Sequence, residues 1–287
     1  MLAALLILFS SGTSLVEGIL IKKYNAKHGK GGFIFTAMVS LFSMLFFVIT
    51  DKGGFDFRPE MLPYGIASGI FYCLASFLTY VALCCGPFAM SMLVLSYSVV
   101  FSVSYGVFFL KDDISVFTVI GILLILVSIY LNRAEKKDED KKASLKWLIC
   151  IGISFVGNGM LGVIQKMQQV RFGNAVNNEY MIVTLGVSAI TLFIIGFIKD
   201  GKDAAYFFKH GSVYASLGGI SNGCTNFLAL AINMLMLISI ASPARAGTKI
   251  IMSFIVSRFI FKEKFLTRQM ISVFVGAVAL ILLNIKI

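Results

Sequence analysis

Residues 2–23 read LAALLILFSSGTSLVEGILIKK, an apolar run of about 20 residues that closes on two lysines. A helix needs about 20 mostly apolar residues to cross the hydrocarbon core of a bilayer. No basic residue precedes the run, and Glu17 lies inside it, which is not the pattern of a cleaved signal peptide. The run therefore predicts a first membrane-spanning helix.

The whole chain continues in the same manner. Of its 287 residues 58% are hydrophobic and only 14% are charged, against roughly 25% charged residues in an average soluble protein. Long apolar runs alternate with short polar breaks, which predicts an all-α integral membrane protein. We expect ten transmembrane helices, at residues 2–21, 32–50, 62–84, 87–110, 114–131, 146–168, 180–198, 212–234, 238–261 and 266–285.

One segment divides the chain near its middle. Residues 133–142, RAEKKDEDKK, are almost entirely charged and predict a solvated linker at 133–144 between halves at 1–132 and 145–287. The halves repeat weakly: Ser14 to Lys22 aligns with Asn158 to Lys166, 144 positions later. Five helices in each half would make the second half enter the membrane upside down, as in the inverted repeats of many secondary transporters.

The net charge of +11 does not predict nucleic-acid binding, because the basic residues sit in short clusters between apolar runs. Such clusters are typical of membrane boundaries. By the positive-inside rule they predict a cytoplasmic linker and external termini. The lack of organelle signals favours a multi-pass protein of the cell membrane.

No pattern of enzyme chemistry is present in the sequence. The chain lacks a Gly-rich phosphate loop and a set of cysteines and histidines at metal-ligand spacing. The five cysteines lie in apolar runs, while His28 and His210 fall in polar loops and predict exposed side chains without ligand partners. We therefore expect no enzyme activity, no cofactor and no metal. Without an ATP-binding motif, active transport would use a gradient.

Three ionisable residues lie inside predicted spans, where a charge costs at least about 2.5 kcal/mol and a functional role is the first expectation. Glu17 is the acid well inside an apolar run, and it would bind a proton, a cation or a substrate amine; a structural ion pair is the alternative. Arg245 and Lys249 are four residues apart on one helix face and would hold a carboxylate or phosphate. Snorkelling to headgroups is the alternative for Arg245.

Uncharged polar residues gather at helical spacing on other predicted spans. They are candidates for solute contact, although hydrogen bonding between helices explains such residues equally well. The candidates are Asn222 and Asn226 in the eighth span, Tyr72, Ser76 and Tyr80 in the third, and Ser14, Asn158 and Gln165 at repeat-equivalent places in the first and sixth.

Several of these stretches resemble the drug/metabolite transporter superfamily, in particular its ten-helix EamA-like family. The resemblance lies in GILIKK (18–23), GVIQK (162–166), ASFLTYVAL (75–83) followed by Gly86-Pro87, and FKEKFLTRQMISVFVGAVALILLN (261–284). It implies a cavity lined mainly by the first, third, fourth, sixth, eighth and ninth helices, and cytoplasmic termini, which is opposite to the charge count.

The chain also departs from the family pattern. Lys111-Asp112-Asp113 stands where Glu is usual, and Val99 and Ile250 lie near the places of the usual mid-helix prolines. The four-helix small multidrug transporters of the same superfamily keep a carboxylate eight residues before a lysine. Counting back from Lys22 gives Ser14, so Glu17 is displaced by about one turn along nearly the same face.

These observations predict a secondary transporter of a small organic metabolite, an amino-acid-like zwitterion or a small organic anion, working by alternating access between the halves. Its expected partners are the solute, the lipid bilayer and a coupling ion such as a proton. A proton-coupled multidrug efflux protein for lipophilic cations is the alternative within the class, with Glu17 as the exchanging group. A non-transporting membrane scaffold ranks below both, because the loops are short apart from the linker.

Overall fold

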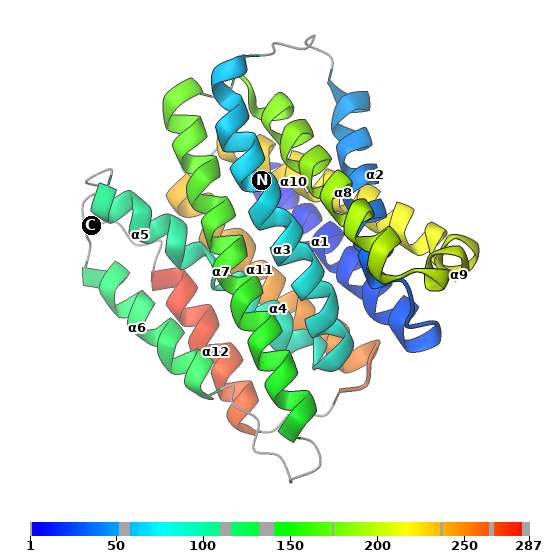
Figure 1. Ribbon diagram of the computed structural model, residues 1–287. Coiled ribbons are helices and arrows are strands. Elements are labelled where there is room, and N and C mark those ends of the chain that lie inside the picture. Colours follow the sequence, from blue (N-terminus) through cyan, green and yellow to red (C-terminus); the bar gives the residue numbers. More distant parts are fainter. Residues whose placement is uncertain are drawn as a thin grey trace.

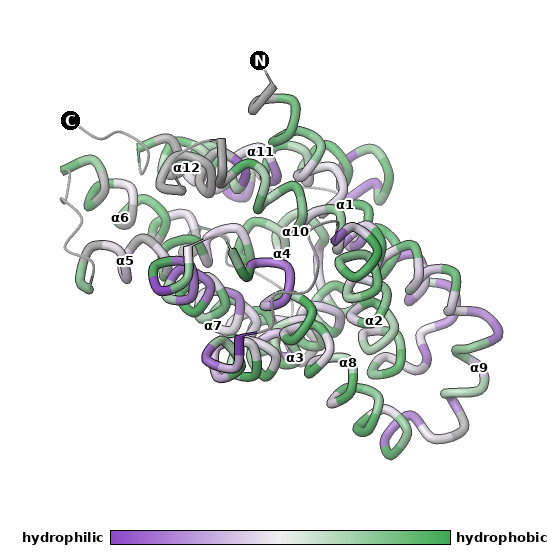
Figure 2. Tube along the Cα trace, turned by 90° about the horizontal axis from the view of Figure 1, so that it is seen from above, coloured by the Kyte–Doolittle hydropathy of each residue, from purple (hydrophilic) through white to green (hydrophobic). Residues whose placement is uncertain are grey.

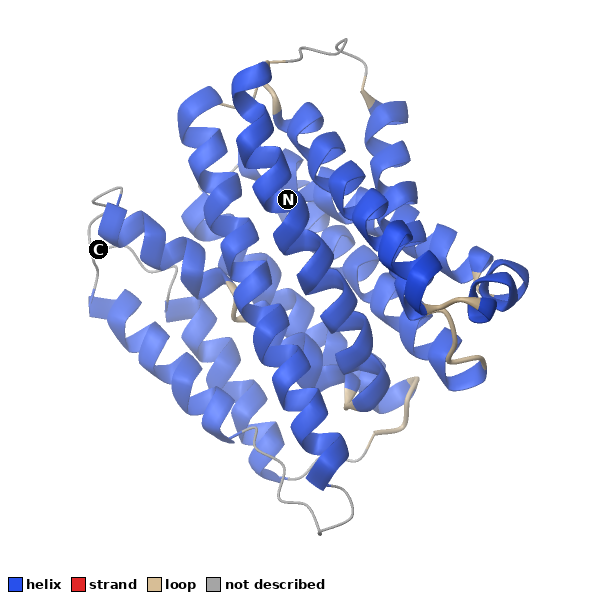
Figure 3. Cartoon of the chain, in the orientation of Figure 1, coloured by secondary structure: helices blue, strands red, loops and turns tan. Residues whose placement is uncertain are grey.

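The computed structural model describes residues 2–51, 58–109, 116–131, 141–173, 175–235, 238–263 and 267–282. Within these residues the chain is helical throughout, with short turns and no strand (Figure 3). The helices form a single bundle (Figure 1). Their bounds are α1 (Leu2–Lys27), α2 (Gly32–Thr50), η1 (Pro59–Met61), α3 (Leu62–Cys85), α4 (Phe88–Ser96), α5 (Val99–Phe109), α6 (Val116–Leu131), α7 (Lys141–Phe172), α8 (Asn177–Lys199), α9 (Lys202–His210), α10 (Ser212–Leu235), α11 (Ile238–Phe259) and α12 (Thr267–Leu282).

Six helices among the described residues are long and apolar enough to cross a membrane. They span Leu5–Lys27, Gly32–Thr50, Pro59–Cys85, Phe88–Gly106, Leu145–Phe172 and Asn177–Lys199. Large apolar side chains face outward, such as Ile49 at 80% exposure and Phe259 at 76%, which suits contact with lipid. Green apolar helix segments give way to purple polar turns in Figure 2. The helical membrane class is confirmed, whereas the count of ten spans stays a prediction.

The fourth predicted span, 87–110, corresponds to the candidate span Phe88–Gly106, but its helix has a break at residues 97–98 that divides it into α4 and α5. Around the break the backbone bonds tighten: the Ser98 N–H donates to the Leu95 carbonyl at 3.2 Å and the Val100 N–H to Tyr97 at 3.0 Å. The ring of Tyr97 is fully buried there, and its hydroxyl hydrogen-bonds Ser128 of α6. An i→i+3 turn with a polar anchor interrupts a helix whose composition alone predicts continuity.

Two further boundaries differ from the sequence prediction. Helix α1 continues through Lys22 and Lys23 to Lys27, and α7 begins at Lys141, inside the predicted linker. Charged residues at a helix end can reach solvent along their apolar stems, so hydropathy underestimates helix length there. Residues 133–140 of the linker and Lys111-Asp112-Asp113 lie outside the described residues.

Helices far apart in sequence form the principal contacts. Helix α3 packs on α7 and α8, α10 packs on α1 and α2, and α2 also packs on α8. Helices α6 and α12 lie side by side at one edge of the bundle (Figure 1). There the hydroxyls of Ser128 and Ser272 donate to each other's carbonyls, at 2.6 Å and 2.8 Å.

Glycines allow the closest of these crossings. A Cβ on Gly69 of α3 would lie 2.6 Å from the Cβ of Val187 in α8. A Cβ on Gly219 of α10 would lie 2.6 Å from the carbonyl oxygen of Val39 in α2. Small residues are the usual means by which membrane helices approach each other closely. These contacts bring α3 against α8 and α10 against α2, while α10 also packs on α1.

Candidate functional site

A cavity of about 390 Å³ lies inside the bundle, between the two halves of the chain. Residues of α1 to α5 line it from the first half, and residues of α7, α8, α10 and α11 from the second. All eleven residues proposed from the sequence border this one cavity: Ser14, Glu17, Tyr72, Ser76, Tyr80, Asn158, Gln165, Asn222, Asn226, Arg245 and Lys249. Their geometry differs from residue to residue.

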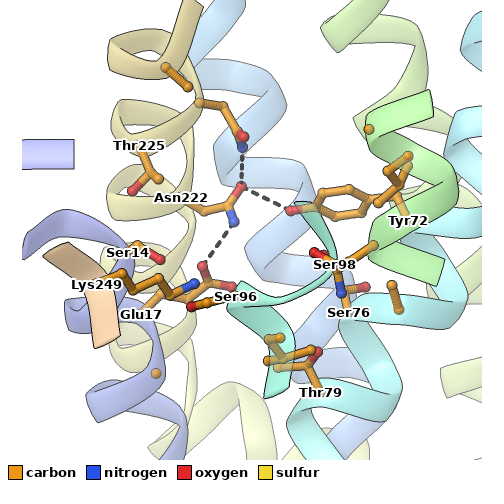
Figure 4. Close-up of a pocket in the computed structure, with 18 of the residues that line it drawn as sticks. Ser14, Glu17, Tyr72, Ser76, Thr79, Ser96, Ser98, Asn222, Thr225 and Lys249 are labelled. Atoms are coloured by element: carbon orange, nitrogen blue, oxygen red, sulfur yellow. Dashed lines mark hydrogen bonds between the residues drawn. The ribbon is translucent and has the colours of Figure 1, made fainter. Parts of the chain in front are cut away.

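Asn222 is the centre of a hydrogen-bond network on one wall (Figure 4). Its Oδ1 accepts hydrogen bonds from the Ser43 hydroxyl, the Tyr72 hydroxyl and Asn226 Nδ2, each at 2.9 Å. Its Nδ2 donates to Glu17 Oε2 at 2.8 Å. Three donors on one carbonyl oxygen fix the orientation of the amide, so its N–H groups face Glu17. The network joins α1, α2, α3 and α10.

Glu17 and Lys249 come from opposite halves and lie near each other at the cavity wall. Figure 4 places both side chains below Asn222, and the carboxylate and the ammonium group interact electrostatically. Opposite charges held in a site of low dielectric offset much of each other's desolvation cost. Glu17 therefore has both a hydrogen-bond donor and a positive charge beside it.

Arg245 lies one turn before Lys249 on α11 and also borders the cavity. Its Nη1 is buried and has no hydrogen-bond partner among the described residues. Most buried polar atoms in proteins are paired, and an unpaired guanidinium nitrogen is costly. The Ser11 hydroxyl donates to the backbone oxygen of Arg245 at 3.4 Å, which ties this part of α11 to α1.

Other candidates use their polar atoms in helix packing or turn them along their own helix. Asn158 Nδ2 donates to the Ser154 carbonyl at 2.8 Å, and the Ser76 hydroxyl donates to the Cys73 carbonyl at 3.3 Å. Tyr80 is 6% exposed, and its ring lies 5.3 Å from that of Phe35. These residues shape the cavity wall.

The eighth predicted span splits its polar face between two tasks. The Ser221 hydroxyl donates to the Thr13 carbonyl at 2.7 Å, and the Thr225 hydroxyl to that of Thr13 at 2.7 Å, so both hold α10 against α1. Asn222 and Asn226 turn to the network at the cavity. Helix packing and solute contact were alternative explanations for this face. In the structure Ser221 and Thr225 pack the helix, whereas Asn222 and Asn226 face the cavity.

The residues that the sequence did not predict include Ser43, which lies beside the cavity in the Asn222 network, and Gln169, which lines the cavity. Ser43 of α2 completes the network, although an isolated serine in an apolar run gives no signal in the sequence. Gln169 lines the cavity and its Nε2 has no partner among the described residues. Its place four residues after Gln165, on the same helix face, was a usable signal. The predicted span ended at 168, one residue too early.

One end of the bundle is joined by a second cluster of contacts, centred on Glu263. Its two carboxylate oxygens accept from the Phe88 N–H at the start of α4, at 2.8 Å and 3.1 Å. The carboxylate also pairs with Lys22 of α1 and accepts from the Ser257 hydroxyl of α11. Glu263 lies in the stretch 261–284 that resembles the family. It thus caps α4, a helix of the other half.

The histidines correct a further expectation. His28 and His210 lie together, with ring centroids 5.2 Å apart, and His28 Nδ1 lies 2.9 Å from the Tyr206 hydroxyl. Both are half-buried rather than fully exposed. Among the described residues no group of three or more His, Cys, Asp or Glu is placed to hold a metal ion.

Comparisons with known proteins agree with the helical membrane fold. Residues 1–134 match the model of the EamA-like transporter family. A solved structure titled "Crystal structure of protein" aligns over 96% of each chain, with a TM-score of 0.52 and 15% identity, and it is one of 28 matching chains of solved structures. At this identity the likeness concerns the fold alone. No curated protein matched the chain. The resemblance seen in the sequence is thus confirmed over residues 1–134, and the chain is a multi-pass membrane protein whose first half carries the pattern of the EamA-like transporter family.

Proposed function

We propose that this protein is a secondary transporter that carries a small organic metabolite through the central cavity by alternating access. One observation carries the proposal: charged side chains from both halves converge on a single internal cavity. Glu17 comes from α1, while Arg245 and Lys249 come from α11. Buried ionisable residues inside a membrane bundle are costly, and they mark solute pathways more often than packing.

The proposal includes two five-helix repeats of opposite orientation, with the segment at 133–144 as their connection. Helix pairing supports this arrangement. Under exchange of the halves, the α3–α7 contact corresponds to α10–α1, and α3–α8 corresponds to α10–α2; both members of each pair are present. Gly69 and Gly219, which align when the second half is shifted by 150 positions, each lie at one of these close crossings. Pseudosymmetric halves around a central site provide two similar conformations for alternating access.

The break between α4 and α5 also supports a transport site. Ser96, Ser98 and Val99 of this break border the cavity. Discontinuous helices near mid-membrane are a recurrent source of solute contacts in transporters, because irregular backbone is tolerated where it lines a cavity. The hydroxyl groups of Ser96 and Ser98 would add polar contacts to the cavity that Arg245 and Lys249 also border.

The size and polarity of the cavity favour a metabolite. About 390 Å³ lies within the range typical of small-molecule sites, roughly 300–1,000 Å³. One acid, two bases of α11 and several amides and hydroxyls surround it, which suits an amino-acid-like zwitterion or a small organic anion. A proton is our proposed coupling ion, and the cell membrane our proposed location.

The proposal is tested by counterflow in proteoliposomes loaded with pooled amino acids and carboxylates. We expect exchange of a labelled metabolite by the parent protein and its loss in Lys249→Ala. Arg258→Ala provides a matched control, because Arg258 lies exposed on the same helix. Absence of exchange for every metabolite, with intact folding, would overturn the proposal.

Proton-coupled export of lipophilic cations is the second candidate, and the observation in its favour is the carboxylate of Glu17 at the cavity wall. The same vesicles discriminate the two functions. Export of lipophilic cations that stops in Glu17→Gln and continues in Lys249→Ala would favour the multidrug function. The reverse dependence on these residues would favour metabolite transport.

A further inference from the structure

Two residues that line the cavity each have a buried polar atom without a hydrogen-bond partner among the described residues, and both atoms are hydrogen-bond donors. They are Nη1 of Arg245 and Nε2 of Gln169, from α11 and α7. Buried donors without acceptors are rare in folded proteins, and each calls for an explanation such as a ligand. A ligand that satisfies them must bring acceptor oxygens. For a guanidinium group the best acceptor is a carboxylate or another oxyanion.

Glu17, in contrast, already has its interactions supplied by the protein. One of its oxygens accepts the Asn222 amide at 2.8 Å, and Lys249 provides a compensating charge. The Asn222 amide cannot turn away, because Ser43, Tyr72 and Asn226 hold its other end. A substrate ammonium group at Glu17 would have to compete with Lys249 and leave that lysine buried without its counter-ion, which is unfavourable.

The balance of charge leads to the same ligand class. Glu17 of α1 and two bases of α11, Arg245 and Lys249, border the cavity, so one acid faces two bases. A zwitterion brings no net charge and leaves this excess of positive charge in place. An anion reduces it, and in a site of low dielectric that difference is large.

We infer that the cavity selects a small organic anion whose carboxylate is bound by Arg245, and that Glu17 is the internal counter-ion of Lys249 and not a subsite for a substrate amine. This inference rests on the proposed transport function and narrows its substrate class. Gln169 of α7 then donates a hydrogen bond to a second acceptor atom of the ligand. An α-amino group is then dispensable for binding, whereas the carboxylate is essential.

The test uses sets of compounds that share one hydrocarbon group and differ in whether they carry a carboxylate, an amine, both or neither. Propanoate, alanine, propanamide and ethylamine form one set; 3-phenylpropanoate, phenylalanine, 3-phenylpropanamide and phenethylamine form a second. Binding to the purified full-length protein is measured by the ligand-dependent rise in unfolding midpoint, which follows mass action. We expect the carboxylate lacking an amine to bind at least as tightly as its amino acid, and the amide and amine not to bind.

Variants locate the contact. Arg245→Gln should weaken carboxylate binding roughly 10- to 150-fold, the range for loss of a hydrogen bond to a charged group. Arg245→Lys should retain part of the affinity, Arg258→Gln all of it, and Glu17→Gln should leave the anion bound. Two outcomes would refute the inference and leave metabolite transport standing. One is an amino acid that binds while the acid without the amine does not. The other is anion binding that is unchanged in Arg245→Gln. Binding by no member of either set, or by the amines alone, would refute the inference and count against the proposed function as well.

Discussion

Replacement of Glu263 by Gln tests whether the cluster at the end of α1 holds the bundle together. The side chain is 16% exposed and that of its partner Lys22 is 21% exposed. Gln keeps the shape and one acceptor oxygen but removes the charge. The ion pair with Lys22 is lost, and the two bonds from the Phe88 N–H weaken or disappear. The positive end of α4 also loses a neighbouring anion.

The magnitude follows from these contacts. Hydrogen bonds to a charged group are each worth about 1.5–3 kcal/mol, and an anion at a helix N-terminus about 0.3–1 kcal/mol. Since Gln restores part of the hydrogen bonding, we expect a net loss of about 2 kcal/mol. For a protein of this size that corresponds to roughly 4–8 °C in unfolding midpoint.

The assay is thermal unfolding in detergent, followed with a thiol-reactive dye. The protein supplies the reporters, because all five cysteines are free and none is exposed in the folded state. Glu60→Gln is the matched control. Glu60 forms an ion pair as well, with Arg171, but the two groups are 3.8 Å apart and 71% of the Glu60 side chain is exposed. We therefore expect the free energy of unfolding to change by no more than about 0.5 kcal/mol. Equal midpoints for the two variants would refute the argument from burial.

Three further outcomes are expected. Arg245→Met should stabilise the ligand-free protein by about 1–2 kcal/mol and so raise its unfolding midpoint, because it removes a buried guanidinium nitrogen that has no partner among the described residues; a lower midpoint in thermal unfolding would mean that Arg245 is structural. Gly219→Ala should cost about 1–3 kcal/mol in the same assay, since its Cβ would lie 2.5 Å from that of Phe42, whereas Gly152→Ala, whose Cβ meets no described atom within 4 Å, should be neutral or stabilising. The pKa of His28 is lowered by burial and by neighbouring positive charge, so the folded state holds fewer protons than the unfolded chain, and stability should fall as the pH drops below about 6.5; His28→Gln should flatten a pH series of midpoints.

Most of the helices could be located from hydropathy, because the signal of an apolar run depends on length and composition alone. The span at 32–50 coincides with α2. The break inside 87–110 could not be found in this way, since it depends on Tyr97 reaching Ser128 of another helix. Proline, the usual sequence signal of such a break, is absent there. The boundaries at Lys27 and Lys141 were missed because charged residues end an apolar run before they end a helix.

The residues around the cavity could also be proposed from sequence, since an ionisable or amide side chain in an apolar run has few places to go in a membrane bundle. The sequence could not show which of these polar residues face the cavity and which hold helices together. Asn222 and Ser221 are neighbours of similar polarity, yet one bonds Glu17 and the other bonds the backbone of α1. Only the packing of α10 against α1 decides which of them faces inward.

The division of polar residues between packing and cavity bears on how the protein could combine stability with transport. Bonds such as those from Ser221 and Thr225 to Thr13 satisfy their groups inside the protein and hold α10 to α1 regardless of any solute. Arg245 lies a short distance away with a donor that nothing in the described structure satisfies. Because that cost is removed when an acceptor arrives, the occupied site is more stable than the empty one. A solute that satisfies this group in one conformation and not in the other would therefore shift the conformational equilibrium by that difference in free energy.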